Sequence, residues 1–278
     1  MSPTRAIDDR LAVCSWSLAP RDADDLIDQL QQVGVMRTQL ELGPLRDESA
    51  WSDARLKLQD AGVQLTGGMF RTIGEDYSTL ETIRETGGVV PDATWESNWA
   101  GIQRIPAVME DLQIDVVMFH AGFLPHEKSD PNYAKLKDRL RQIAHLFAQH
   151  NMTICFETGQ ENAASLNAFL DDLDQPNAKV NFDPANMILY NMGDPVEAVR
   201  ALGPRVHSVH LKDANLTTTP GAWGEEVVLG TGQVDWPNFF GALEEIGFQG
   251  YLAIEREAGA TRIDDIRTAV EYVRVSYG

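Results

Sequence analysis

The chain has 278 residues, of which 43% are hydrophobic, and its 42 acidic against 23 basic residues give a net charge of −19. This charge argues against nucleic acid, anionic membranes and other partners that a positive field would attract. Neither a signal pattern nor an apolar run of membrane-spanning length is visible. Cys14 and Cys155 lie in apolar runs, as small core residues of a reducing cytosol do, so we expect a cytoplasmic protein.

Strand-like runs alternate with helix-like patterns along the chain. The expected strands are Leu11–Trp16, Arg37–Gly43, Val63–Phe70, Asp115–Ala121, Met152–Thr158, Ala178–Pro184, Val206–Asp213 and Gly250–Glu257. The expected helices are Asp22–Val33, Glu48–Ala61, Asn98–Leu112, Asn132–His150, Asn162–Leu173, Pro195–Leu202, Pro237–Ile246 and Arg262–Val275. Eight such pairs in about 250 residues predict a closed (β/α)8 TIM barrel. No linker divides residues 1–278, which indicates one domain; a doubly wound open sheet is the alternative, although no Gly-rich phosphate motif follows the first strand.

Two connections are too long to be simple turns. Residues 71–97 and residues 214–236 both follow strands, so in a barrel both lie at the C-terminal face, where active sites are built. Both contain tryptophan, which favours ordered loops that cover a site.

Four successive strands in the second half of the chain repeat one polar pattern. Side chains on a strand alternate between two faces, so large apolar residues can face the helices while a polar residue near the strand's end faces the barrel mouth. These polar residues are Glu157 in TICFET, Asp183 in KVNFDP, His210 in VHSVHLKD and Glu255 in YLAIERE. Any one of them alone would more often be a solvated rim residue. Their matching position in four consecutive strands is what points to a common site.

Three carboxylates at one end of a barrel cannot all stay ionised unless a cation joins them. We therefore predict that Glu157, Asp183, His210 and Glu255 bind one divalent metal ion. An oxygen-rich set with one nitrogen favours Mn²⁺ first, with Mg²⁺ or Co²⁺ as alternatives, over Zn²⁺.

Four further polar residues are candidates for substrate contacts. His120 in VVMFHAG faces inward and is a candidate for a substrate hydrogen bond. Lys212 would either bind a substrate oxygen or pair with a neighbouring acid. Glu41 is either a substrate contact or part of a salt bridge in the bottom layer of the barrel, and Asn186 would either turn the backbone or reach the substrate.

The chain resembles the xylose isomerase-like TIM-barrel superfamily, which includes sugar-phosphate isomerase/epimerase proteins, ketose 3-epimerases, inosose dehydratases and apurinic-site endonucleases. The segments CFETGQEN, NFDPANMILYNMGDPVEAV, VHSVHLKDA and VLGTGQVDWPNFFGALEEIGFQGYLAIE carry the resemblance, and their order is more specific than any one of them. It implies that Glu157, Asp183, His210 and Glu255 occupy the positions of the metal ligands of the ketose 3-epimerases, where the two glutamates also form the acid/base pair.

Two residues depart from the ketose 3-epimerase pattern. Asn186 stands where those enzymes have a histidine, and Lys212 stands where they have a small residue. Both changes alter substrate contacts, so the identity of the sugar does not carry over. The endonucleases use a multi-zinc site with several more histidines, which the six histidines and the acidic charge of this chain oppose.

The predicted activity is that of a metal-dependent sugar epimerase or aldose–ketose isomerase acting through an enediolate on a ketose or a related keto-sugar or polyol. Glu157 and Glu255 would remove and return the proton on opposite faces of the substrate. If the enediolate instead expels a β-hydroxyl or a β-glycosidic oxygen, the same site is a dehydratase or lyase for an inosose or keto-glycoside. A non-catalytic sugar- or metal-binding barrel is the second alternative. Homo-oligomerisation is an expectation from the family alone.

Overall fold

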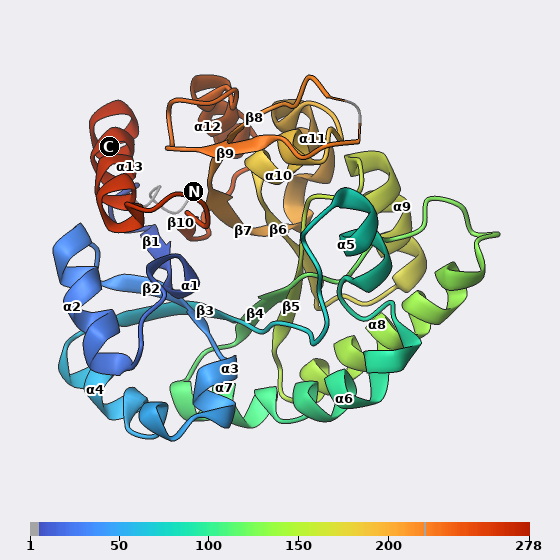
Figure 1. The fold of residues 1–278 in the computed structure, drawn as a ribbon, viewed down its shortest axis with the longest axis horizontal. Helices are drawn as coiled ribbons and strands as arrows, with labels where there is room; N and C mark the ends of the chain where they lie inside the picture. Colours follow the sequence, from blue (N-terminus) through green and yellow to red (C-terminus); the bar gives the residue numbers. More distant parts are fainter. Residues whose placement is uncertain (1–5, 220) are drawn as a thin grey trace.

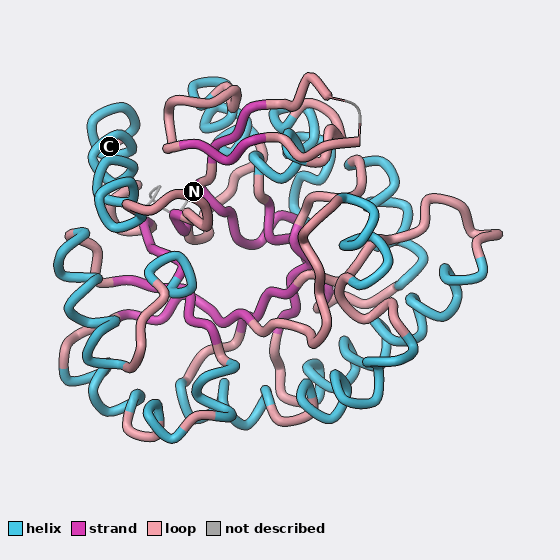
Figure 2. The backbone as a smooth tube through the Cα atoms, viewed as in Figure 1, coloured by secondary structure: helices cyan, strands magenta, loops and turns pink. Residues whose placement is uncertain are grey.

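Eight parallel strands close into a barrel, as predicted. In the computed structural model, which describes residues 6–219 and 221–278, the order around the barrel is β1-β10-β7-β6-β5-β4-β3-β2, and each neighbouring pair is parallel. The barrel strands are β1 (Leu11–Cys14), β2 (Arg37–Glu41), β3 (Gln64–Met69), β4 (Val116–Phe119), β5 (Thr153–Glu157), β6 (Ala178–Phe182), β7 (Val206–Leu211) and β10 (Leu252–Ile254). Figures 1 and 2 show this ring of strands with helices around its outside, the arrangement of a (β/α)8 barrel.

The outer layer contains long helices and several short ones. The longer helices are α2 (Ala23–Val33), α6 (Asp92–Ile102), α7 (Ile105–Leu112), α8 (Pro131–Gln149), α9 (Ala163–Leu173), α11 (Pro195–Leu202), α12 (Trp236–Glu245) and α13 (Arg262–Tyr277). The short ones are α1 (Ser15–Leu18), α3 (Gly43–Asp47), α4 (Ala54–Asp60), α5 (Leu80–Thr86), α10 (Pro184–Leu189) and the 3₁₀ turns η1 (Ser49–Trp51) and η2 (Gly203–Arg205). Among the described residues, no helix has both the length and the apolar character that crossing a bilayer requires.

Prolines account for two of the differences from the predicted elements. The helix predicted over Asn98–Leu112 is two helices, because Pro106 is in the first turn of α7, where its missing N–H costs no hydrogen bond. The strand predicted to reach Pro184 ends at Phe182, and Pro184 starts α10 instead. The helix predicted over Glu48–Ala61 begins only at Ala54, after the turn η1.

Side chains of the barrel strands alternate between the inside and the outside of the barrel, as predicted, and form two separate apolar clusters. The inside of the barrel is filled by a small cluster from five strands and their ends: Ala12, Cys14, Trp16, Met69, Met118, Cys155 and Ala253. Strand residues whose side chains point outward, such as Phe156 and Phe182, belong to the larger core between strands and helices. The pocket lies at the C-terminal end of the strands, where the inward-pointing residues are polar.

The two long connections contain secondary structure of their own within the described residues. Residues 71–97 contain α5 and the first part of α6. Residues 214–236 are built on an antiparallel hairpin of β8 (Asp213–Asn215) and β9 (Glu225–Val227), which Figure 1 shows beside α10 and α11. Tyr77 from the first segment and Trp223 from the second line the same pocket, so both segments form walls of one site.

Candidate metal centre

The four predicted metal ligands meet at the C-terminal end of the barrel. Glu157 ends β5, Asp183 follows β6, His210 lies in β7 and Glu255 follows β10. One ligand atom of each residue lies within 4.8 Å of the ligand atoms of the other three. Asp183 and His210 are fully buried, and Glu255 is nearly so. Strands β5, β6, β7 and β10 are neighbours around the barrel. Because each of the four side chains points to the inside of the barrel, this order brings them together.

Asp183 is held by the start of α10. Its Oδ1 accepts hydrogen bonds from the backbone N–H of Ala185 at 2.8 Å and of Asn186 at 3.1 Å, as the N-cap of that helix. Its Oδ2 faces the cluster, 3.9 Å from His210 Nδ1. One carboxylate therefore both starts a helix and contributes an oxygen to the centre.

The ligand atoms have the character of a site for a cation. Glu157 Oε1, Asp183 Oδ2 and His210 Nδ1 are buried and have no hydrogen-bond partner among the described residues. Glu157 Oε1 lies 2.9 Å from His210 Nδ1, but not in hydrogen-bond geometry. Unpartnered buried polar atoms are costly, and a divalent ion among them would satisfy all three. Three carboxylates and one imidazole suit Mn²⁺, Mg²⁺ or Co²⁺, so the residues present fit such an ion.

Lys212 supplies a positive charge beside the cluster. Its Nζ lies 2.9 Å from Glu255 Oε2, 3.4 Å from Asp183 Oδ2 and 3.2 Å from Glu257 Oε2. Burial opposes protonation, yet these carboxylates hold the pKa of Lys212 well above its ordinary value. Of the two roles considered for Lys212, the structure shows the ion pair.

The two buried carboxyls beside Lys212 differ in their affinity for protons. Burial raises the pKa of Asp183 to about 7. Burial acts the same way on Glu255, but the charges of Lys212 and His210 outweigh it and hold the pKa of Glu255 well below its ordinary value. Trp16 Nε1–H also donates to Glu255 Oε1 at 2.6 Å. Glu255 is therefore held as a carboxylate.

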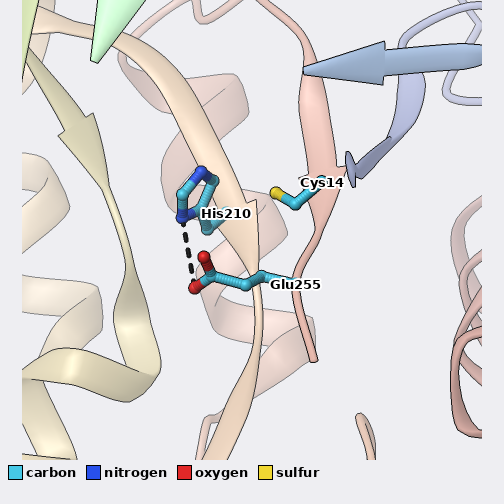
Figure 3. Close-up of side chains that lie close together, drawn as sticks. All are labelled: Cys14, His210 and Glu255. Carbon is cyan, nitrogen blue, oxygen red and sulfur yellow. Dashed lines mark ion pairs between the residues drawn. The ribbon is translucent and has the colours of Figure 1, made fainter. Parts of the chain in front are cut away.

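The two ring nitrogens of His210 face different partners. Its Nδ1 faces the acids, 3.4 Å from Glu255 Oε2, and Figure 3 shows this contact, with Cys14 pointing toward the imidazole from β1. Its Nε2 lies 2.8 Å from Gln39 Oε1 on β2. Burial disfavours the imidazolium, but the charge of Glu255 holds the pKa of His210 well above its ordinary value.

His120 and Asn186 lie in the wall of the pocket. His120 Nδ1 is 2.9 Å from Glu75 Oε1, and its Nε2 is 3.2 Å from Gln160 Nε2. Asn186 is in the first turn of α10, donates its Nδ2–H to Thr158 O at 3.1 Å and accepts from Lys212 at 3.2 Å. Both line the same pocket as Glu157 and Glu255.

Glu41 makes a salt bridge, but not in the bottom layer of the barrel. It is the last residue of β2, at the C-terminal end, and its Oε1 accepts from Arg71 Nε at 2.8 Å. Arg71 lines the pocket, so Glu41 reaches the site through this arginine.

The pocket above the cluster has a volume of about 380 Å³. Its floor carries Glu157, Glu255 and Lys212. Its apolar walls come from strand ends, α10 and the two long connections: Trp16, Met69, Phe70, Tyr77, Met118, Leu189, Tyr190 and Trp223. A small number of convergent polar groups in an aromatic-lined cavity is the usual form of a small-molecule site.

Several residues of this site were not found from the sequence. Gln39 has the same parity as Glu41 on β2, so the alternation contained a signal for it. The strand predicted over Leu11–Trp16 ends at Cys14, but Trp16, in α1, still lies on the same side as Ala12 and Cys14, so the alternation contained a signal for it too. Glu75 lies in a connection, where no periodic pattern fixes the direction of a side chain.

A family model described as a xylose isomerase-like TIM barrel matches residues 29–275. The chain belongs to this family. A solved structure described as a xylose isomerase domain protein from Planctomyces limnophilus is 34% identical, covers 90% of this chain and 91% of its own, and superposes with a TM-score of 0.84. The resemblance inferred from the sequence is thus confirmed for family and fold.

Curated members of this family have different activities. L-ribulose 3-epimerase of Methylomonas sp. (strain DH-1) is 28% identical over 151 residues, which are 50% of this chain and 48% of the epimerase. Inosose dehydratase of Geobacillus kaustophilus (strain HTA426) is 23% identical over 264 residues, 84% of this chain and 80% of the dehydratase. The aligned part thus spans about half of the epimerase and most of the dehydratase. The relatives of this chain thus include an epimerase and a dehydratase, which catalyse different reactions.

Proposed function

We propose that this chain is a metal-dependent sugar epimerase or aldose–ketose isomerase that acts on a ketose or a related keto-sugar or polyol. The observation that carries the proposal is the placement of two glutamates at the ends of one ligand set. Glu157 on β5 and Glu255 after β10 flank Asp183 and His210, which come from the two strands between them. A substrate over the cluster would have a carboxylate on either side.

The ligands would be Glu157, Asp183, His210 and Glu255, with Mn²⁺ as the foremost candidate ion. When bound, a divalent ion supplies Lewis acidity that stabilises negative charge on the oxygens next to the carbon that loses its proton. One glutamate would take that proton and the other would return one. Return to the same carbon from the opposite face inverts that carbon, whereas return to the neighbouring carbon, with a proton passing between the two oxygens, moves the carbonyl. Either glutamate can act first, as a reaction that runs in both directions requires.

Polar residues in the pocket wall would hold the rest of the substrate. Lys212 lies next to Glu255, Asn186 lies next to Lys212, and both would donate to a carbonyl or hydroxyl oxygen. His120, fixed by Glu75 and Gln160, would contact a more distant hydroxyl, and Glu41 would act through Arg71. The many acids of the pocket favour a neutral, hydroxyl-rich substrate over an anionic one.

A dehydratase is the second candidate, and the position of Lys212 favours it. The Lys212 ammonium lies in the pocket 2.9 Å from Glu255 Oε2 and 3.2 Å from Glu257 Oε2. It is a protonated donor close to the carboxylate that would remove a proton. The same site could thus protonate a hydroxyl that leaves from the neighbouring carbon.

Solvent exchange of substrate hydrogens tests both candidates. The Mn²⁺-loaded protein would be incubated in D₂O with a panel of ketopentoses, ketohexoses and inososes, and followed by proton NMR. We expect deuterium to enter next to the carbonyl and an epimer or aldose to appear. Loss of water to an unsaturated ketone would instead assign the dehydratase. Bound metal with no exchange on any member of the panel would contradict an enzyme of either kind.

Variants connect the exchange to the two glutamates. Glu157→Gln and Glu255→Gln should each lower the exchange rate by about 10²–10⁴-fold, the usual effect of a general acid or base. Glu161→Gln is the matched control, because Glu161 is a buried glutamate whose Oε1 accepts from the Leu124 N–H and does not belong to the ligand set. Equal loss in all three variants would point to a folding defect rather than to catalysis.

A further inference from the structure

Gln39 lies behind the metal centre, on the side of His210 that faces away from the acids. It is on β2, across the barrel from β7, and is 3% exposed. Its Oε1 is 2.8 Å from His210 Nε2. The same oxygen accepts from Cys14 Sγ at 3.8 Å, and Cys14 is completely buried.

The direction of this hydrogen bond follows from the chemistry of the amide. A carbonyl oxygen only accepts, so Nε2 of His210 carries the hydrogen in this contact. The thiol of Cys14 donates to the same oxygen, which keeps the oxygen of Gln39, rather than its NH₂ group, toward the imidazole. Figure 3 shows Cys14 pointing toward the His210 ring from β1.

The other ring nitrogen of His210, Nδ1, is therefore the one that faces the metal centre. His210 Nδ1 lies 2.9 Å from Glu157 Oε1 and 3.4 Å from Glu255 Oε2, and it has no hydrogen-bond partner among the described residues. A metal ion binds the imidazole nitrogen that has no hydrogen, and the group bonded to the other nitrogen decides which one that is. We propose that Gln39 is the positioning residue that holds His210 as an Nδ1 ligand; this inference rests on the metal site of the proposed function.

A neutral amide suits this position for an electrostatic reason. Glu157, Asp183 and Glu255 already bring three carboxylates to the centre, and a fourth acid behind His210 would add to their mutual repulsion in the absence of metal. The amide fixes the ring without adding charge. A glutamate at position 39 would still accept from Nε2–H, so it is the conservative replacement that should restore the contact.

The first test measures metal affinity. Mn²⁺ binding would be followed by calorimetry for wild type, Gln39→Leu, Gln39→Met and Gln39→Glu, with circular dichroism to confirm folding. We expect affinity to fall roughly 10–100-fold in the leucine and methionine variants, as is usual when the group that orients a ligand is removed, and to recover in the glutamate variant. Gln160→Leu is the control, since Gln160 is equally buried but contacts His120 rather than a ligand. Wild-type affinity in Gln39→Leu and Gln39→Met would overturn the inference.

The second test observes the imidazole itself. In metal-free protein labelled with ¹⁵N-histidine, wild type should show an Nε2–H proton of His210 that exchanges slowly with solvent, assigned by its absence from His210→Ala. Gln39→Leu should lose this signal and Gln39→Glu should regain it. A wild-type spectrum without it would overturn the inference. If wild type binds no Mn²⁺, the proposed function fails together with the metal role of Gln39, whereas Mn²⁺ binding unaffected at position 39 overturns the role of Gln39 alone.

Discussion

At the scale of single residues, Asp183 shows how a carboxylate is kept in a buried place. Two backbone N–H groups at the start of α10 bind Oδ1, and the remaining oxygen has no hydrogen-bond partner among the described residues, although Lys212 Nζ lies 3.4 Å from it. Burial raises the pKa of this carboxyl to about 7, although Lys212 lowers it. Asp183 therefore competes for protons near neutral pH, and so does His210, whose pKa lies well above 6.5.

These two groups predict how metal affinity depends on pH. Both pKa values are raised, so each group holds a proton below its pKa, and a metal ion must displace it. Affinity for Mn²⁺ should accordingly rise as pH increases from 5 to 8, by up to about tenfold per pH unit for each proton displaced. Calorimetry in two buffers of different ionisation enthalpy measures both the affinity and the protons released. An affinity that is flat over this range, with no proton release, would contradict the raised pKa values.

Lys212 should stabilise the metal-free protein. Its side chain is 4% exposed and is paired with Asp183 and Glu255, so Lys212→Met leaves buried carboxylates uncompensated. We expect a loss of about 3–5 kcal/mol of unfolding free energy in EDTA, as for other broken buried pairs, and a smaller loss with Mn²⁺. Urea unfolding in both conditions measures it.

The matched control for Lys212 is Lys57→Met. Lys57 also pairs with two aspartates, Asp24 at 2.7 Å and Asp53 at 3.1 Å, but at the surface. Such a pair contributes less than about 1 kcal/mol. Equal losses for the two lysines, or a loss at Lys212 that Mn²⁺ does not reduce, would refute the proposed role of Lys212.

At the scale of elements, Asp213 fastens the hairpin segment to the barrel. Its buried carboxylate accepts hydrogen bonds at 2.9–3.2 Å from the backbone N–H groups of Ala214, Gly230, Gly232 and Val234 and from Trp236 Nε1–H. The close approach requires a glycine at position 232, where a Cβ would lie 2.2 Å from Asp213 Oδ1. One side chain thus fixes the segment that brings Trp223 to the pocket.

Removing this carboxylate should loosen the whole segment. Asp213→Ala leaves several buried N–H groups unpaired, so we expect a loss of about 3 kcal/mol or more and faster proteolysis within residues 214–235. Asp235→Ala is the control, because it removes only the cap of α12 and should cost about 1 kcal/mol. Urea melts and limited proteolysis would measure both. Similar losses and similar cleavage in the two variants would show that Asp213 has no special role in the segment.

The elements also show what sequence patterns can and cannot predict. The succession of eight strand-like and eight helix-like runs predicted the barrel, and the alternation of side chains along β5, β6, β7 and β10 predicted the four residues that meet. This alternation can be read locally, and parallel pairing places the corresponding side chains of neighbouring strands side by side. The two helices in place of Asn98–Leu112 and the hairpin of β8 and β9 were not predicted. The break between the two helices follows from Pro106, which is a local signal, whereas the hairpin depends on pairing between segments outside any one periodic run, such as that of Ala214 with Glu226. Gln39 was missed because its partner, His210, is 171 residues away.

At the scale of the whole molecule, a net charge of −19 coexists with a buried cluster of three carboxylates. Folding without metal brings these carboxylates close together in a protein that is already negatively charged, and their electrostatic repulsion opposes folding. One bound divalent ion would remove much of this repulsion. The ligands come from four strands of a closed barrel, so the unfolded chain has no comparable site. Metal binding should therefore be coupled to the stability of the entire fold.

This coupling predicts a shift of the melting temperature with metal. Binding to the folded state alone adds about 2.7 kcal/mol when Mn²⁺ is at 100 times its dissociation constant. For a chain of this size that is a rise of roughly 5–10 °C above the value in EDTA. Differential scanning calorimetry measures it, with Glu157→Gln and His210→Ala as variants that should lose the rise, and Glu161→Gln as one that should keep it. A rise of equal size in His210→Ala would mean that Mn²⁺ stabilises the fold from a different site, and the cluster at the barrel mouth would then need another explanation for its unpartnered atoms.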